Sequence, residues 1–312
     1  MKIFKSTIEA VPFDGTALTV GTFDGIHKGH RTIIDKLNEQ AQLLGLQSLL
    51  FTFEPHPKIV MQKSGVPELK LLTTIDEKIA VLGTTGLDSL VVSSFTRSFA
   101  ATSAEDFVRD TLVKKLKMKC VILGHDHAFG RNRQGNDELL KKLGRELGFQ
   151  VQTVEPISNS GEHISSTRIR HALQDGRVGA AAFMLDRPYE VTGTVVEGQK
   201  QGRELGFPTA NLRPDSEHKL IPKVGIYATT VRIDGQVFES VTYIGSRPTF
   251  AGRQSVVEVH VHDFENDLYG KSLTVYFYKF LREDRKFQST GELVETIKND
   301  KKNAITYFAN GG

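Results

Sequence analysis

The chain has 312 residues, of which 39% are hydrophobic and 25% charged, and these values predict about two domains of an ordinary soluble globular protein. A formal net charge of +3 is compatible with anionic small ligands. It is smaller than the strongly positive charge typical of a nucleic-acid-binding protein. The first residues lack the apolar region of a signal peptide and no apolar run reaches membrane-spanning length, so we expect a cytoplasmic protein with no nucleic-acid or membrane partner.

The first 186 residues alternate short β-like runs with helix-like patterns. Such alternation predicts an α/β fold, in which helices cover both faces of a parallel sheet. The only cysteine, Cys120, lies in an apolar run and is expected to be a buried strand residue and not a nucleophile. Because ligands of such sheets bind beyond the carboxyl ends of the strands, the loops after Val20, Phe53 and Leu123 should converge on one crevice. The expected strands are 18–20, 48–53, 90–95, 119–123 and 149–154, and the expected helices are 31–44, 74–82, 103–116 and 136–147.

The segment 21–30, Gly-Thr-Phe-Asp-Gly-Ile-His-Lys-Gly-His, joins the first of these strands to its helix. Glycines allow backbone N–H groups to approach an anion closely, and a helix N-terminus adds partial positive charge. His27 and His30 can then donate hydrogen bonds to phosphate oxygens. The pattern is typical of a nucleoside-triphosphate site without a Walker loop. The alternative, for so short a motif, is a tight turn whose histidines cap a helix.

Two further loops follow predicted strands. In the loop 53–57, Pro55 and Pro57 stiffen the chain and hold His56 at the rim of the crevice, although a rigid turn with a surface histidine would have the same sequence. In the loop 124–133, Asp126 could hold a ribose, an amide or a metal-bound water, and the arginines could face phosphates. The run His125-Asp126-His127 is also compatible with a metal site. We favour it less, because successive side chains of an extended segment point in opposite directions.

The segment 164–170 leads into a helix and carries Ser165, Ser166, Thr167 and Arg168. Three hydroxyl groups, the nearby backbone N–H groups and one guanidinium would form a second phosphate cradle. Read alone, the same residues describe a Ser/Thr helix cap with an arginine beside it.

The pattern changes after residue 186, so we expect domains at 1–186 and 187–312. Asp234-Gly235, between two β-like runs, is a strong hairpin signal. The second domain is therefore expected to be antiparallel β, closed as a small barrel, followed by a helix at 289–308 with a solvated charged face. The expected strands are 189–196, 225–233, 237–244, 256–262 and 273–281.

Two groups of residues in the second domain have side chains that could bind a metal ion or act as a base. Thr209 and Asn211 put two neutral oxygen ligands on one side of an extended stretch, and Mg²⁺ accepts such ligands together with water and phosphates. A simple Thr/Asn turn is the alternative. Glu258 and His260 share one face of a predicted strand. A glutamate in an otherwise apolar strand is costly unless it is paired or faces a cleft, so Glu258 is either a surface residue or a working base.

In this order, the segments 21–30, 53–57, 124–130 and 164–170 resemble the nucleotidyltransferase module of prokaryotic bifunctional riboflavin kinase/FAD synthetases. The segments 208–211, 245–250 and 267–270, together with Glu258, resemble the riboflavin kinase module of the same family. The resemblance implies a Rossmann-like nucleotidyltransferase domain, then a six-stranded antiparallel barrel with a C-terminal helix. Two residues depart from the family pattern, since phenylalanine is more usual than His127 and arginine is more usual than His163.

The resemblance also implies roles for individual residues. In the first domain, His27 and His30 would hold the ATP phosphates and Arg168 would close over them with the neighbouring hydroxyls. In the second domain, Glu258 would take the proton from the ribityl 5′-hydroxyl of riboflavin. The implied ATP-binding residues of the first domain are Gly21, Phe23, Asp24, His27, His30, Asp126, Ser165, Ser166, Thr167 and Arg168, with Pro55, His56 and Pro57 at the flavin. Those of the second domain are Gly206, Pro208, Thr209 and Asn211 for Mg²⁺ and ATP, with Arg282, Lys286 and Phe287 at the flavin.

The implied function is a two-step synthesis: ATP phosphorylates riboflavin to FMN, and a second ATP adenylylates FMN to FAD with release of pyrophosphate. Two alternatives are an enzyme with one degenerate module and a flavin-sensing or nucleic-acid-binding regulator. Both motif sets are intact, and a regulator would leave Glu258 and Thr209 without a purpose. We therefore expect small-molecule substrates and a monomer or weak homo-oligomer.

Overall fold

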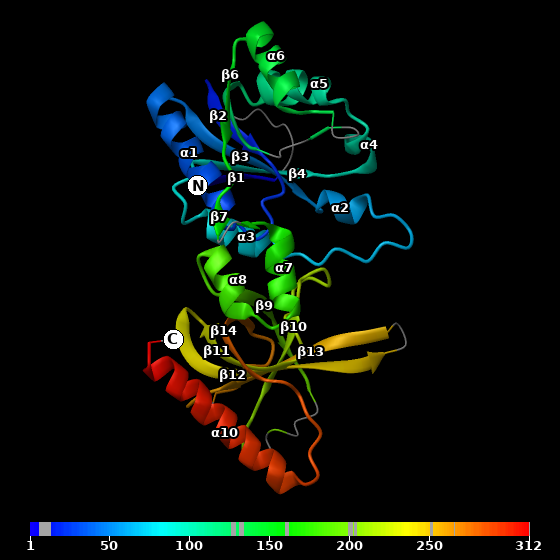
Figure 1. Ribbon diagram of the computed structural model, residues 1–312, viewed down its shortest axis with the longest axis vertical. Coiled ribbons are helices and arrows are strands. Elements are labelled where there is room, and N and C mark those ends of the chain that lie inside the picture. The colour runs from blue at the N-terminus through cyan, green and yellow to red at the C-terminus, as the bar shows by residue number, and fades with distance from the viewer. Residues whose placement is uncertain are drawn as a thin grey trace. The chain divides into compact units, whose positions relative to one another are not determined.

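The computed structural model describes residues 1–5, 14–125, 129–130, 134–159, 162–198, 202, 205–249, 252–264 and 266–311. The chain divides into two compact units, Met1–Ser165 and Ser166–Gly312, each with its own sheet (Figure 1). Among the residues described, no helix has the length and hydropathy required to cross a membrane.

The first unit is built on a six-stranded parallel sheet, which confirms the expected α/β fold. The chain runs outward from β2 through β3 to β4 on one side, and through β5 to β6 on the other. The strand order therefore reverses between β2 and β5, and such a switch point is where open α/β sheets bind their ligands. The strands, in order across the sheet, are β1 (Lys2–Phe4), β4 (Ser89–Ser94), β3 (Gln47–Glu54), β2 (Thr16–Val20), β5 (Met118–Gly124) and β6 (Gln150–Val154).

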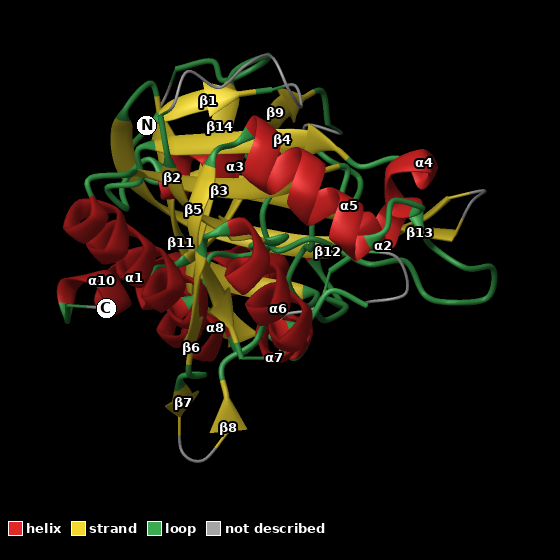
Figure 2. Cartoon of the chain, turned by 90° about the horizontal axis from the view of Figure 1, so that it is seen from above, coloured by secondary structure: helices red, strands yellow, loops and turns green. Residues whose placement is uncertain are grey.

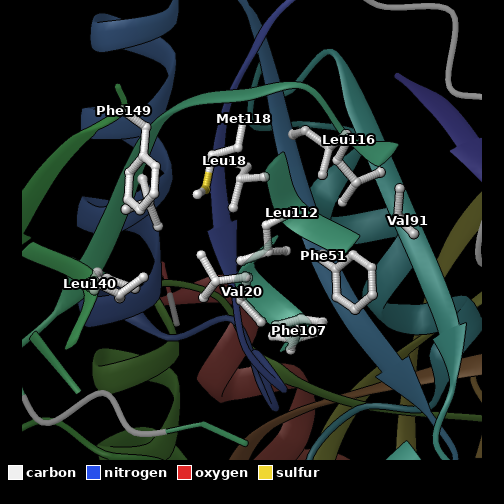
Figure 3. Close-up of a cluster of buried hydrophobic side chains, with 14 of the residues drawn as sticks. Leu18, Val20, Phe51, Val91, Phe107, Leu112, Leu116, Met118, Leu140 and Phe149 are labelled. Carbon is white, nitrogen blue, oxygen red and sulfur yellow. The ribbon is translucent and has the colours of Figure 1, made fainter. Parts of the chain in front are cut away.

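Helices cover both faces of this sheet, because its strands are apolar on both sides. One face packs against α1 (Lys28–Leu44) and α3 (Ile75–Leu82). The other packs against η1 (Phe107–Lys115) and α6 (Asp137–Leu147), and Figure 3 shows the side chains that meet there. Cys120 is fully buried on the α1 side, as expected, and burial raises the pKa of its thiol to about 11.

The helix ends follow the local sequence. Thr74 and Glu77 form the expected capping box at the start of α3, and Gly148 ends α6 in the left-handed conformation. The helix expected at 103–116 differs, because after the short α5 (Ala104–Asp106) the chain continues in the wider turns of η1. The buried residues of that segment are Phe107, Val108, Leu112 and Leu116, and they pack into the same core as the sheet. The remaining short elements are α2 (Pro57–Val60), α4 (Arg97–Ala100) and the hairpin of β7 (Ser158–Asn159) and β8 (Glu162–His163), visible in Figure 2.

The second unit is a closed six-stranded antiparallel barrel, as the family resemblance implied. Asp234 and Gly235, at φ 49° and 87°, form the expected two-residue hairpin turn between β11 and β12. Strand β10 was not expected as a strand, and β12 and β13 are longer than expected. The barrel order is β10 (Ala210–Pro214), β13 (Gly252–Val261), β12 (Gln236–Thr249), β11 (Gly225–Ile233), β14 (Ser272–Arg282) and β9 (Tyr189–Val196).

Helices α7, α8 and α10 belong to this unit. α7 (Ser166–Gln174) and α8 (Val178–Leu185) precede the barrel in sequence, and α8 packs beside β9 and β14. α10 (Thr290–Ala309) begins at the capping residue Ser289 and packs beside β11, β12 and β14. A bidentate ion pair joins the Arg282 guanidinium at the end of β14 to the buried Asp300 carboxylate of α10, at 2.7–3.1 Å.

The His262 side chain, just beyond β13, makes the stability of the barrel depend on pH. It is 6% exposed, and within the described part of the chain neither ring nitrogen has a hydrogen-bond partner. Burial, followed by the charges of Lys301 and His260, lowers its pKa from 6.5 to about 4, and the negative charge of Asp263 opposes this shift. Above pH 6.5 His262 is neutral in both the folded and the unfolded state. As the pH falls from 6.5 towards 4, only the unfolded state takes up the proton, so the free energy of unfolding decreases.

We therefore expect His262→Phe to remove part of the acid destabilisation between pH 6.5 and 4. The effect of this single group is at most about 1.4 kcal/mol per pH unit. Calorimetric unfolding of the full chain at several pH values, with and without the substitution, measures it. Parallel pH dependences of the two proteins would contradict the prediction.

Candidate active sites

The turn after β2 is tight and is held by burial. Phe23 and Ile26 adopt left-handed backbone conformations, at φ 45° and 40°, which cost energy for residues with side chains. Both side chains are buried, at 4% and 0% exposed, so the apolar core beneath the turn stabilises this conformation. The Gly21 amide donates to the Phe51 carbonyl and continues the contact between β2 and β3. The turn therefore presents a fixed backbone at the switch point of the sheet.

The Asp24 carboxylate fastens a second segment to this turn. It accepts hydrogen bonds from the backbone amides of Leu72 and Thr73, at 3.0 and 3.1 Å, and is 3% exposed. The Thr73 hydroxyl in turn accepts from the Gly25 amide at 3.1 Å. Asp24 thus has a structural task in the turn, and its expected contact with ATP stays a prediction.

A buried lysine, which the sequence analysis missed, supports the same turn. The Lys78 ammonium group donates to the Thr22 carbonyl at 2.7 Å, and the Thr52 hydroxyl donates to the same carbonyl at 3.3 Å. Burial lowers the pKa of Lys78, which is 4% exposed, while the negative charges of Asp24 and Glu54 oppose that shift. A signal was present in the sequence, since Lys78 shares the inward face of α3 with the apolar residues three and four positions later.

His27 and His30 stand together at the start of α1. His27 is the N-cap, and its Nδ1 accepts from the His30 amide at 3.3 Å. Because Nδ1 accepts this bond, a neutral His27 ring carries its proton on Nε2. The two rings stack at 3.7 Å between centroids, and a Cβ at Gly29 would lie only 3.3 Å from His27. The capping interpretation and the phosphate-binding interpretation are thus compatible, because capping uses only Nδ1 of His27.

His30 is held neutral by its surroundings. Burial, followed by the positive charges of His27 and Lys78, lowers its pKa well below 6.5. Its Nδ1 is buried without a hydrogen-bond partner among the residues described. A neutral ring with unused hydrogen-bonding capacity at a helix N-terminus is suited to donating to an anion.

The loop after β3 ends in a buried histidine beside a group of phenylalanines. His56 is 7% exposed, so it is not a surface residue, and its Nδ1 caps α2 by accepting from the Lys58 amide at 3.1 Å. At the same end of the sheet, the rings of Phe53, Phe95 and Phe99 meet one another at 5.4–5.6 Å between centroids. Phe53 is buried in the core of the sheet, and Phe95 and Phe99 are partly buried against it.

The third and fourth segments are only partly described. Asp126 and His127 lie outside the described residues, and His125 is exposed with Nδ1 3.9 Å from the Glu155 carboxylate. In the described ranges no group of three His, Cys, Asp or Glu residues could hold a metal ion. The chain returns to the start of α1 at Ile164, whose carbonyl oxygen lies 3.9 Å from the position of a Cβ on Gly29. Ser165 follows directly, and Ser166, Thr167 and Arg168 begin α7.

In the second unit, the structure brings the expected kinase residues together. Asn211 of β10 lies directly opposite Glu258 of β13, and the Thr209 hydroxyl is 3.4 Å from the Glu258 carboxylate. These three side chains lie on the outer face of the barrel, because the alternate residues Val257 and Val259 are buried. Two glycines make room for them, since a Cβ at Gly198 would clash with the Asn211 side chain and one at Gly202 would lie 3.2 Å from the Thr209 hydroxyl.

The segment after β14 is tied to this face. The Tyr243 hydroxyl donates to the Asp284 carboxylate at 2.9 Å, and Tyr243 is the β12 partner of Glu258. Of the expected flavin residues, Arg282 is bound to Asp300, Lys286 is exposed, and the Phe287 ring lies 5.8 Å from the Arg282 guanidinium. Tyr243 was not expected beside Glu258, and no local sequence pattern distinguishes it.

Comparison with known proteins shows which family the chain belongs to. Family models described as FAD synthetase and riboflavin kinase match residues 11–168 and 185–308. The bifunctional riboflavin kinase/FMN adenylyltransferase of Escherichia coli (strain K12) is 36% identical over 311 residues, covering 99% of this chain and 98% of that protein. The protein of the same description from Bacillus subtilis (strain 168) is 34% identical over 303 residues, covering 95% of this chain and 93% of that protein.

A crystal structure described as that of a macrolide-efflux protein from Streptococcus pneumoniae has the same fold, with a TM-score of 0.87 and 30% identity over 97% of this chain and 98% of that one. The sequence relatives and both family models cover the two units. The chain therefore belongs to the family of bifunctional riboflavin kinase/FMN adenylyltransferases, which convert riboflavin to FAD.

Proposed function

We propose that the kinase reaction takes place on the outer face of the barrel, in the domain 187–312, and that the adenylyltransferase reaction takes place at the end of β2, in the domain 1–186. The observation that carries the proposal is the meeting of Thr209, Asn211 and Glu258 on one face. Two neutral oxygen ligands for a hard cation, beside one carboxylate that can accept a proton, are groups suited to phosphoryl transfer.

In the kinase step, the Glu258 carboxylate accepts the proton of the ribityl 5′-hydroxyl of riboflavin. The ribityl oxygen then bonds to the γ-phosphorus of ATP while the bond to the β-phosphate bridge breaks, which gives FMN and ADP. The Thr209 hydroxyl and the Asn211 amide oxygen fit Mg²⁺, a hard cation that prefers oxygen ligands. When bound there, Mg²⁺ would neutralise phosphate charge. We assign Gly206 and Pro208 to the ATP side, and Arg282, Lys286 and Phe287 to the flavin side, where Arg282 acts by holding the segment on α10.

In the adenylyltransferase step, a phosphate oxygen of FMN bonds to the α-phosphorus of ATP and pyrophosphate leaves. The nucleophile is already ionised, so no strong base is required, and catalysis comes from positioning and charge stabilisation. His27 and His30 donate from the start of α1, and the backbone of Gly21 and Phe23 shapes the turn. We assign Asp126, Ser165, Ser166, Thr167 and Arg168 to the nucleotide. The loop of Pro55, His56 and Pro57, with the neighbouring phenylalanine rings, receives the flavin.

The purified chain with riboflavin, excess ATP and Mg²⁺ should form FMN first and FAD after it, as followed by chromatography. FAD from added FMN, but no product from riboflavin, would refute the kinase assignment. FMN alone would refute the adenylyltransferase assignment, and no turnover of either flavin would favour a flavin-sensing regulator.

Sedimentation velocity would test the proposed monomeric or weakly associating state, and fractionation of the source cells would test the proposed cytoplasmic location.

A further inference from the structure

The backbone hydrogen bonds between β10 and β13 stop beside the proposed kinase site. Strands β10 and β13 pair as far as Ala210 and Val259, and the chain before Ala210 contains Pro208, which has no N–H to donate. The Pro208 carbonyl is nevertheless bonded, since the His260 Nδ1 lies 2.9 Å from its oxygen. A carbonyl oxygen only accepts, so Nδ1 of His260 must carry the proton.

The surroundings of His260 keep its ring neutral and in place. Burial lowers its pKa below the usual 6.5, the positive charge of Lys301 lowers it further, and the Pro208 bond and the negative charge of Asp263 oppose this. Its ring meets Phe207 edge-to-face at 5.6 Å and His262 at 5.8 Å. Its Nε2 is buried and has no hydrogen-bond partner within the described ranges. Among the described residues the ring therefore bonds only through Nδ1, and that bond holds the start of the segment 208–211.

We propose that His260 is a positioning residue of the kinase site, which fixes the Pro208 carbonyl and thereby sets Thr209 and Asn211 against Glu258. The inference rests on the proposed function of these three residues. Its physical basis is that His260 and Glu258 project from the same face of one strand, two residues apart, so a single rigid element holds both the base and the proposed metal ligands.

Three substitutions at His260 separate the hydrogen bond from the packing. Asparagine places an N–H near the position of Nδ1, glutamine places one near Nε2, and phenylalanine keeps the ring but has no donor. Loss of a hydrogen bond of ordinary strength corresponds to about a tenfold decrease in rate. We expect His260→Phe and His260→Gln to lower kcat/KM of riboflavin phosphorylation by about tenfold or more, mainly through kcat and the KM for ATP, with the KM for riboflavin less affected.

The asparagine variant should recover most of this loss, and FAD formation from supplied FMN should be unchanged in all three. His262→Phe is the matched control, because His262 lies two residues further on the same side and makes no hydrogen bond to a described residue. Equal losses in His260→Asn and His260→Phe, or unchanged ATP dependence in His260→Phe, would overturn the proposal.

A spectroscopic measurement tests the proposal without turnover. Long-range ¹H–¹⁵N spectra of the His260 ring should show a protonated Nδ1 and a bare Nε2, and the opposite tautomer would overturn the role. If the wild-type chain formed no FMN, the proposed function would fail. The ring spectrum of the wild type would still decide whether His260 holds Pro208, because the signals missing from His260→Phe identify those of His260.

Discussion

Glu258→Gln is expected to abolish the formation of FMN from riboflavin while leaving the conversion of FMN to FAD intact. A positioned general base contributes about 10²–10⁴-fold to a rate, and glutamine has the shape of glutamate but cannot accept the proton. The Thr209 hydroxyl can still donate to the amide oxygen of the new side chain, so the local geometry should persist. The measurement is the initial rate of each step with purified protein, followed by chromatography of riboflavin, FMN and FAD.

The matched control is Tyr243→Phe, on the neighbouring strand opposite Glu258. It removes the hydroxyl that binds Asp284 and leaves the carboxylate in place, so it should affect the KM for riboflavin more than kcat. If Glu258→Gln phosphorylated riboflavin at nearly the wild-type rate, Glu258 would orient the substrate or the metal instead of taking the proton.

The opposite pattern is expected from His30→Ala, which should lower FMN adenylylation by about 10²–10³-fold and leave riboflavin phosphorylation unchanged. Losing one preorganised donor to a charged transition state typically has an effect of this size. His30 is suited to this role because its ring is neutral and its Nδ1 makes no bond to the described part of the chain. The rate of FAD formation from FMN and ATP measures the effect.

Two substitutions at His27 distinguish capping from phosphate binding. His27→Asn retains an acceptor at the N-cap, where asparagine is among the preferred residues, but removes the Nε2 donor. His27→Ala removes both. We expect both variants to lose adenylylation and only alanine to lose stability, by about 1 kcal/mol. An asparagine variant with wild-type activity would leave His27 as a helix cap alone.

The sequence was informative wherever the signal is local. The capping box of Thr74 and Glu77, the left-handed Gly148 and the Asp234-Gly235 turn each depend on residues within a few positions of one another, so they could be identified without a fold. The alternation of apolar runs likewise predicted the parallel sheet and the barrel. The order and content of the motifs then identified the family, because seven short segments and Glu258 in a fixed order are far more specific than any one of them.

The sequence could not reveal the partners of the polar side chains around these motifs. Lys78 supports the Thr22 carbonyl, Asp24 holds the Leu72 and Thr73 amides, and His260 holds the Pro208 carbonyl, in each case across about fifty positions of chain. Such pairs are set by sheet register and by which helix covers which face, and these depend on the packing of a whole unit. The sequence by itself therefore determined the family, the fold class and the residues able to perform the chemistry. Only the tertiary structure decided that Asp24 and Arg282 are bound within the protein, Asp24 to the Leu72 and Thr73 amides and Arg282 to the Asp300 carboxylate.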